Sequence, residues 1–373
     1  MTPKKVGIIT FHAAHNYGSV LQAFALKTVV GKVLNLDSHI INFRTEKQKD
    51  QYRPLTKRRG IKYIIKNGYF LLNYRKRNEK YLKFEQFICD KLVKNEPEYN
   101  RLDELYKIEQ QYDYYISGSD QIWNPIPNDF DEAYLLPFVK NGKRVAYAPS
   151  FGGKTWNDSD RLREFLHKYD SLSVREFEGQ QYLSEVLGQQ VAVMPDPTLL
   201  LDREDYEPLA GNRIIQGEYI FFYTLFASKE MIKIVSKISE RLGLPVVISN
   251  TSNQYEIFNR FIKIKDCGPA DFLSLIKHSK LNVVTSFHGT VFSTIFNKPF
   301  FAIDGMNDCR ICTLLKQLGL ENRSITTENL DDCLDYSFEL DYEQPNKKRK
   351  QLRMMGFDYL KKALDINEND LQN

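Results

Sequence analysis

The segment from residue 282 to residue 290, N-V-V-T-S-F-H-G-T, holds the side chain best suited to chemistry in this chain. His288 carries an imidazole, which donates or accepts a proton near neutral pH. Gly289 lets the backbone approach a ligand closely, and Thr290 offers a hydroxyl or a helix cap. The alternative for His288 alone is a histidine that only satisfies the hydrogen bonds of a turn.

The residues around His288 predict a strand, a turn, a helix and a second strand in succession. The apolar pattern places the first strand at 281–285, the helix at 290–297 and the next strand from Pro299. In open α/β sheets the turn after a parallel strand binds ligands, and the following helix points its N–H groups at them. We therefore expect His288 at the ligand-binding edge of a parallel sheet.

A similar turn is predicted near the N-terminus. A strand over 5–10 leads into a helix over 17–33, and Asn16, Tyr17 and Gly18 lie at the start of that helix. This turn could hold an anion on its backbone N–H groups, although it lacks the G-x-G-x-x-G pattern of a dinucleotide site. A helix cap without a ligand explains the same residues equally well.

A second polar turn follows a strand predicted over 112–116. It brings together five small or polar residues, namely Ser117, Gly118, Ser119, Asp120 and Gln121. The nearby Trp123 offers a flat apolar ring suited to a sugar, which favours a ligand-binding turn over a plain loop.

Arg175 follows a strand predicted over 171–174, in the sequence S-V-R-E. A guanidinium at a strand end suits a phosphate or carboxylate, because its planar fork donates two parallel hydrogen bonds. The alternative is that Arg175 pairs with a nearby acid such as Asp196.

Strands and helices alternate along 373 residues, which predicts an α/β protein of two domains because a single core rarely grows this large. Breaker-rich residues near 202–217 separate the halves. We predict an N-terminal Rossmann-like domain over 1–210, a C-terminal Rossmann-like domain over 211–340, and a helix and tail over 341–373.

The composition predicts a cytoplasmic protein. With 42% hydrophobic and 27% charged residues the chain is typical of globular proteins, and no apolar run reaches the roughly 18 residues of a membrane span. The five cysteines are scattered and odd in number, which argues against a disulfide framework. No metal site is expected.

Positive charge is concentrated in a helical insertion predicted over about 44–90. Residues 44–83 contain fourteen Lys or Arg and three acidic residues. Basic and apolar residues alternate within 57–83, so this segment could lie on the inner membrane surface. The alternative is a solvated insertion packed on its domain. Nucleic-acid binding is not expected, because no recognised nucleic-acid fold surrounds the segment.

Taken together, the motifs T-S-F-H-G, S-G-S-D-Q-I-W-N, S-V-R-E, P-D-P-T-L-L and H-N-Y-G-S-V-L-Q-A resemble those of the polysaccharide pyruvyl transferase family. The resemblance covers roughly residues 5–330 and includes the order and spacing of the motifs. It implies two Rossmann-like domains facing each other across a cleft, similar to the glycosyltransferase B architecture. The N-terminal domain would hold the acceptor and the C-terminal domain the donor.

The resemblance also implies an activity. Members of the family transfer the enolpyruvyl unit of phosphoenolpyruvate to a sugar of a capsule or exopolysaccharide precursor and form a pyruvate ketal, with no cofactor. The acceptor would be lipid-linked or nucleotide-linked. His288 would be the acid or base, and Arg175 would hold the phosphate or carboxylate. Ser286, Gly289 and Thr290 would bind the donor, and the turns at 16–18 and 117–123 would line the acceptor side.

One position departs from the family. Many members carry an arginine two residues before the histidine, where this chain has Ser286. Lys298, Arg310 or Arg323 could supply the missing cation. Two alternatives remain at this stage: a nucleotide-sugar glycosyltransferase with the same two-domain plan, and a non-catalytic glycan-binding protein.

Overall fold

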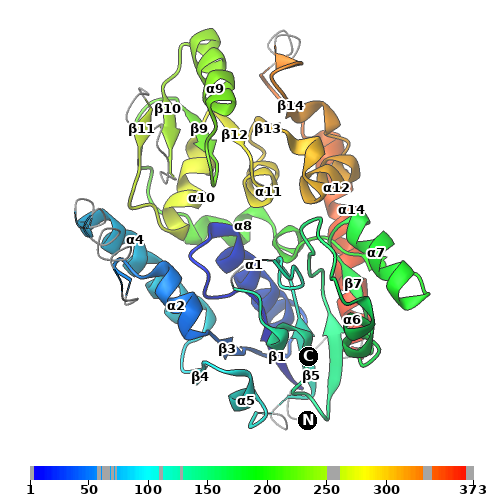
Figure 1. The fold of residues 1–373 in the computed structure, drawn as a ribbon. Coiled ribbons are helices and arrows are strands. Elements are labelled where there is room, and N and C mark those ends of the chain that lie inside the picture. Colours follow the sequence, from blue (N-terminus) through cyan, green and yellow to red (C-terminus); the bar gives the residue numbers. More distant parts are fainter. Residues whose placement is uncertain are drawn as a thin grey trace. The chain divides into compact units, whose positions relative to one another are not determined.

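The computed structural model describes residues 4–56, 60, 68, 71, 74–108, 112–126, 129–249, 261–330 and 338–366 (Figure 1). The chain divides into two compact units. Unit 1 comprises Met1–Leu72, Phe84–Leu201 and Gln351–Asn373, and unit 2 comprises Asn73–Lys83 and Asp202–Lys350. The division after Leu201 precedes the predicted boundary at 210, and the last residues of the chain belong to unit 1.

Unit 2 is built on a parallel sheet with, among its described residues, six strands (Figure 1). The strands are β9 (Ile220–Tyr223), β10 (Val246–Ile248), β11 (Ile262–Lys263), β12 (Leu281–Val284), β13 (Phe300–Ile303) and β14 (Ser324–Ile325). They are arranged in the order β11-β10-β9-β12-β13-β14, and every pair is parallel. Numbered along the chain, this is the order 3-2-1-4-5-6 of the Rossmann fold. The strand order reverses between β9 and β12.

The sequence explains why this sheet is parallel and covered. The strands β9 and β13 read I-F-F-Y and F-F-A-I, and all eight residues are buried, as expected for strands with helices on both faces. The helices are α8 (Arg203–Tyr206), α9 (Lys229–Leu242), α10 (Pro269–His278), α11 (Phe287–Ile295) and α12 (Cys309–Leu318). Helix α9 shows the pattern clearly, because Ser228 caps its start, Ile234, Val235 and Ile238 are buried, and Gly243 ends it in a left-handed conformation.

Unit 1 contains a parallel sheet in the order β2-β1-β5-β6. Its strands are β1 (Lys5–Ile9), β2 (Asp37–Ile40), β5 (Tyr114–Ser117) and β6 (Lys143–Ala146). Two further parallel pairs join β3 (Asn42–Phe43) to β4 (Glu98–Tyr99) and β7 (Ser173–Val174) to β8 (Ala192–Val193). The strand order of the main sheet reverses between β1 and β5, so the loops after these two strands meet at one edge.

The helices of unit 1 follow the predicted pattern at its N-terminus. Helix α1 (Tyr17–Thr28) continues as a π-helical turn over Val29–Val33, which together match the helix predicted over 17–33. The other helices are α2 (Glu46–Tyr52), α5 (Leu102–Leu105), α6 (Ser159–Leu166) and α7 (Phe177–Leu187). Helix α14 (Glu343–Ala363) begins in unit 2 and ends in unit 1, where Tyr359 donates a hydrogen bond of 2.8 Å to the carbonyl of Ala146.

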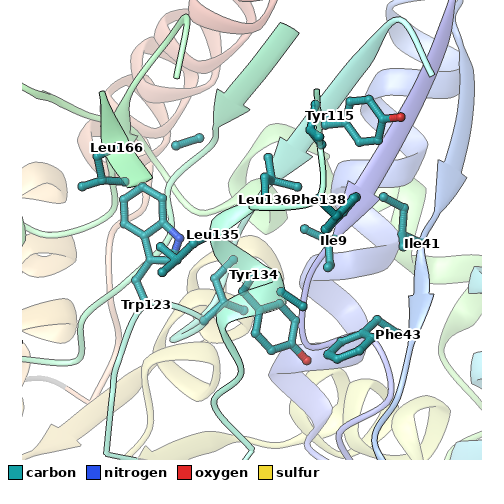
Figure 2. Packing of buried hydrophobic residues seen from close by; sticks show 14 of the residues in the cluster. Ile9, Ile41, Phe43, Tyr115, Trp123, Tyr134, Leu135, Leu136, Phe138 and Leu166 are labelled. Atoms are coloured by element: carbon teal, nitrogen blue, oxygen red, sulfur yellow. The ribbon is translucent and has the colours of Figure 1, made fainter. Parts of the chain in front are cut away.

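The core of unit 1 contains Trp123 and corrects its predicted role. Figure 2 shows Trp123 among core residues that include Leu135 and Leu166. The side chain is fully buried, its ring lies against Phe151 and Tyr169, and its Nε1 donates to the hydroxyl of Ser117. Because the whole residue is buried in this core, Trp123 is not a stacking surface for a sugar.

Much of the predicted basic segment, namely 57–59, 61–67, 69–70 and 72–73, lies outside the described residues. The described part is helix α4 (Tyr74–Phe87), which is followed by a π-helical turn over Ile88–Leu92. In unit 2, Lys83 forms an ion pair of 2.7 Å with Asp271 of α10. Contact of this segment with a membrane stays a prediction. No helix among the described residues is both long and apolar enough to cross a bilayer.

Candidate functional site

His288 lies where the strand order of unit 2 reverses. Strand β12 ends at Val284, and helix α11 begins at Phe287 rather than at the predicted residue 290. The helix starts earlier because Ser286 caps it, and His288 is therefore in its first turn. The side chain is 9% exposed. An imidazole in the first turn of a helix lies beside N–H groups that carry partial positive charge, which suits a reaction on an anion.

Ser286 caps helix α11, which accounts for a serine at the position where many family members have an arginine. Its backbone is extended and its hydroxyl accepts a hydrogen bond of 3.0 Å from the N–H of Gly289. Gly289 is needed for this cap, since a Cβ there would lie 2.9 Å from the Ser286 hydroxyl and 3.0 Å from Val284. Thr290 donates to the carbonyl of Ser286 at 3.2 Å. An arginine at position 286 has no acceptor atom, so it could not cap this helix.

Replacing Ser286 should loosen the start of α11. We expect Ser286→Ala to cost about 1 kcal/mol, as is usual for a lost N-cap, and Ser286→Asn to retain most of the stability. The measurement is amide hydrogen exchange, in which the Gly289 N–H should exchange faster in Ser286→Ala. Unchanged Gly289 protection in that variant would show that Ser286 does not cap the helix in solution.

The loop after β9 lies across the same reversal point and was not predicted as part of the site. Thr285 donates to Thr224 at 2.8 Å, and Thr224 donates to the carbonyl of Phe226 at 2.7 Å. This chain of hydrogen bonds fixes the loop beside α11. Leu225 and Phe226 are 41% and 74% exposed there, so this edge of unit 2 combines an imidazole with apolar side chains.

The three candidate replacements for the missing cation occupy different edges of the sheet. Lys298 precedes β13 and Arg323 precedes β14, which places both at the amino ends of the strands. Lys298 lines a pocket of about 320 Å³ at that edge, and burial together with the nearby cations Arg203 and Lys280 lowers its pKa. Only Arg310 lies beyond the carboxyl end of a strand, at the start of α12. It is the candidate that shares an edge with His288.

Arg310 is held in a fixed orientation by Asp308. Its Nε and Nη2 donate to the two carboxylate oxygens of Asp308 at 3.0 and 2.5 Å. Burial alone raises the pKa of Asp308, but the hydrogen bonds and charge of Arg310 outweigh burial and lower it. This pair keeps a guanidinium ordered at the carboxyl edge of β13.

The two predicted turns of unit 1 meet at the point where its strand order reverses. Asn16 caps α1 by accepting from the N–H groups of Gly18 and Ser19. Ser19 donates to Asp120 at 2.5 Å, and Thr10 donates to the carbonyl of Ser119 at 3.0 Å. The structure thus joins the loop after β1 to the loop after β5.

Several hydrogen-bonding groups of the 117–121 turn are used inside unit 1. Ser117 donates to the carbonyl of Tyr134 and Ser119 to that of Ala148, both at 2.5 Å, and both serines are fully buried. Gly118 has φ +143°, and a Cβ there would lie 2.0 Å from the carbonyl oxygen of Tyr147, so only glycine fits. Tyr17 and Gly18 are buried as well, whereas Asn16 and Gln121 are partly exposed.

Arg175 is surrounded by acids within unit 1. Its Nη1 donates to Asp196 at 2.7 Å, its Nη2 lies 3.8 Å from Asp120, and its Nε lies 4.0 Å from Glu176. The side chains of Arg175 and Asp196 are 2% and 0% exposed. The pair with Asp196, which the sequence left as an alternative, is therefore present. Because three carboxylates already face this guanidinium, we interpret Arg175 as a residue that orders the strand ends of unit 1.

A cluster that sequence reasoning missed joins His15, in the loop between β1 and α1, to Arg44 after β3 and Glu85 in α4. His15 forms a hydrogen bond of 2.7 Å with Glu85, and Arg44 donates to both oxygens of Glu85 at 2.8 and 2.5 Å. No sequence motif predicts this cluster, because its three residues are far apart in the chain. Its members are brought together only by the fold.

Solved structures similar to this chain share its two-unit fold at low sequence identity. A putative UDP-N-acetylglucosamine 2-epimerase from Listeria monocytogenes has a TM-score of 0.57 and 12% identity, covering 99% of this chain and 98% of that one. The S. aureus MnaA–UDP structure has a TM-score of 0.53 and 12% identity, covering 98% of each chain. UDP-GlcNAc 2-epimerase from Methanocaldococcus jannaschii, in complex with UDP-GlcNAc and UDP, has a TM-score of 0.51 and 14% identity, covering 95% of this chain and 99% of that one. These likenesses establish a glycosyltransferase-B-like α/β fold.

Comparison with curated protein sequences gave no significant match. A family model described as polysaccharide pyruvyl transferase matches residues 16–305. The matched stretch begins at Asn16, directly before α1, and includes the loops after β5, β7 and β12, so it also contains Asp120, Arg175 and His288. Because the match spans most of the 373 residues, the chain belongs to the polysaccharide pyruvyl transferase family.

Proposed function

We propose that this protein transfers the enolpyruvyl unit of phosphoenolpyruvate to a sugar of a cell-surface polysaccharide precursor and forms a pyruvate ketal. The observation that carries the proposal is the position of His288 in the first turn of α11, where the strand order of a Rossmann-type sheet reverses. Ligands of open α/β sheets bind at such points. Membership of the family supplies the reaction class.

The reaction needs few protein groups. A proton is added to C3 of the donor, an oxygen of the sugar forms a bond to C2, and a second sugar oxygen then replaces phosphate at C2. Of the two hydroxyl protons that are lost, one is balanced by the proton gained at C3 and the other by the proton on the released phosphate. An acid, a base and an anion-binding surface therefore suffice.

Unit 2 offers groups suited to the donor. His288 would protonate C3, while the N–H groups at the start of α11 and the guanidinium of Arg310 would face the anionic groups. Ser286, Gly289 and Thr290 shape this helix start, so their part in donor binding is to hold its N–H groups in place. Unit 1 would bind the sugar, through the partly exposed Asn16 and Gln121 at the loops after β1 and β5.

The direct test is phosphate release from phosphoenolpyruvate in the presence of lipid-linked or nucleotide-linked sugars. We expect release that requires both substrates, together with a product whose mass equals that of the acceptor plus a pyruvate ketal. Lack of release with a broad acceptor panel, combined with no binding of phosphoenolpyruvate, would refute the proposal. Saturable binding of a sugar nucleotide with glycosyl transfer would instead support a nucleotide-sugar glycosyltransferase.

An Arg310→Met variant separates donor binding from chemistry. Since Met removes the charge but keeps much of the side-chain volume, the KM for phosphoenolpyruvate should rise about tenfold, the equivalent of one lost charged hydrogen bond. Lys298→Met is the matched control at the opposite edge of the sheet and should leave this KM unchanged. Equal KM values for wild type and Arg310→Met would exclude Arg310 as the donor cation.

A further inference from the structure

We infer that unit 2 holds a second ligand site at the amino ends of β12 and β13, which takes a small anion with an apolar body, such as an aryl phosphate or an aromatic carboxylate. The site is the pocket of about 320 Å³ that Lys298 lines. It lies at the edge of the sheet opposite His288, because Leu281 begins β12 and Pro299 directly precedes β13. This pocket is therefore separate from the donor site of the proposed function.

Apolar side chains form one part of the pocket wall. They are Leu242, Leu244, Leu281, Pro299 and Phe338. The carbonyl of Pro299 accepts a hydrogen bond of 2.9 Å from the N–H of Asn282, and the ring of Phe338 packs edge-on against Phe301 with centroids 6.2 Å apart. Because these contacts hold the wall in place, a ligand need order little on binding. A volume of about 320 Å³ is small for a ligand pocket, so it suits a single ring better than a dinucleotide or a lipid chain.

The charged part of the wall includes a lysine without a counter-ion. The charged residues are Glu218, Lys280, Lys298 and Glu339. Lys280 pairs with Glu218 at 3.2 Å, whereas Lys298 forms no ion pair or side-chain hydrogen bond with any residue that the structure describes. The backbone of Lys298 is nevertheless fixed, since its N–H donates to Ser293 at 2.9 Å and its carbonyl accepts from the Tyr342 hydroxyl at 2.5 Å. An ordered lysine beside an apolar wall is suited to hold an anion from solution.

The electrostatic surroundings of Lys298 also favour an anion. Three further cations act on its ammonium, namely Arg203, Arg213 and Lys280. Burial lowers the pKa of Lys298, and the charges of these cations lower it further, while Glu218 opposes them to a smaller extent. Because like charges repel, a bound anion would relieve this repulsion and raise the pKa of Lys298 again.

The alternative role for Lys298 is to neutralise the end of helix α11. The last carbonyls of a helix carry partial negative charge and attract cations. Helix α11 ends at Ile295, just before Lys298. This role predicts a loss of stability when Lys298 is replaced, but no change in ligand binding. The two roles therefore give different results in a binding experiment.

The test is isothermal titration calorimetry of the full chain with phenyl phosphate, an anion with one apolar ring. We expect saturable binding, with inorganic phosphate and benzyl alcohol each binding at least about tenfold more weakly, because each lacks one half of the required chemistry. Lys298→Met should raise the Kd for phenyl phosphate about tenfold or more, the equivalent of one lost charged hydrogen bond. Lys298→Arg keeps the charge and should bind about as well as the wild type.

Three results would overturn the inference. One is the absence of saturable binding of both phenyl phosphate and benzoate. Another is an unchanged Kd in Lys298→Met, which would leave Lys298 with a role at the helix end alone. The third is equal binding of inorganic phosphate and phenyl phosphate, since the apolar wall would then take no part.

Lys277→Met is the matched control. Lys277 lies at the same edge, in the last turn of α10, but it pairs with Glu207 at 3.2 Å and does not line the pocket. Its replacement should leave the Kd for phenyl phosphate unchanged. A loss in Lys277→Met equal to that in Lys298→Met would mean that the general charge of this edge holds the anion, and would contradict a site in the pocket.

Competition with phosphoenolpyruvate distinguishes this site from the donor site. Phosphoenolpyruvate should not displace phenyl phosphate from the pocket, because it lacks an apolar ring and is expected to bind at the opposite edge. Displacement that disappears in Lys298→Met would show that the pocket itself takes the donor, and would overturn a separate site. Since binding is measured without turnover, failure of the proposed reaction would leave this result unaffected.

Discussion

His288→Gln should reduce kcat by about 10²- to 10⁴-fold, the range expected when a general acid is removed. Glutamine can still form hydrogen bonds but cannot transfer a proton, so binding of phosphoenolpyruvate should change little. Steady-state assays of phosphate release would give kcat and KM separately. The loss should appear in kcat, because the proton on His288 matters only in the step that converts the donor.

His278→Gln is the control for this prediction. His278 ends α10 at the amino edge of the same sheet, where its Nδ1 lies 2.9 Å from the carbonyl of Ser274. It belongs to the same unit but lies at the edge opposite His288, so its replacement should preserve kcat. If His288→Gln kept more than half of the wild-type kcat while folded, His288 would not be the acid.

Asp196→Ala should destabilise unit 1 by about 3–5 kcal/mol, because it leaves the charge of Arg175 buried without its closest counter-ion. Asp196 also accepts from the backbone N–H and the hydroxyl of Thr198, at 3.0 and 2.6 Å, so several groups lose their acceptor together. The measurement is urea unfolding followed by tryptophan fluorescence. It reports unit 1, since the two tryptophans of the chain, Trp123 and Trp156, both lie there.

An exposed ion pair gives the comparison for Asp196. Arg101 and Asp103 form such a pair in unit 1, with side chains 72% and 62% exposed. Asp103→Ala should barely change the unfolding midpoint, because solvent screens such pairs. A similarly small effect of Asp196→Ala would contradict the view that Arg175 depends on Asp196, and would reopen its assignment as an anion-binding residue.

The strands and the position of His288 could be predicted from the sequence because both depend on local pattern. Apolar runs such as the one in β12 identify buried strands without knowledge of the fold. The predicted start of α11, at residue 290, lies after the observed start at Phe287. The apolar pattern does not show that Ser286 is the cap of this helix. Capping depends on one side chain and its backbone angle, which periodicity does not reveal.

The surroundings of Trp123, Arg175 and His15 could not be predicted, because they depend on distant partners. Trp123 looks like a binding surface in sequence, yet Phe151 and Tyr169 enclose it in the core. Glu85 lies in a basic segment and gives no sign that it pairs with His15 and Arg44. The sequence therefore identified strand ends well, whereas the partners of each polar side chain required the folded structure.

The division of the chain into units has a consequence for its synthesis. Unit 2 is complete once Lys350 has been translated, but unit 1 also requires Gln351–Asn373. The second half of α14 fills a tight place in unit 1, where a Cβ on Gly356 would lie 2.5 Å from Leu200 and 2.6 Å from Tyr147. We therefore expect unit 1 to complete its packing after unit 2, although the strands of unit 1 are synthesised first.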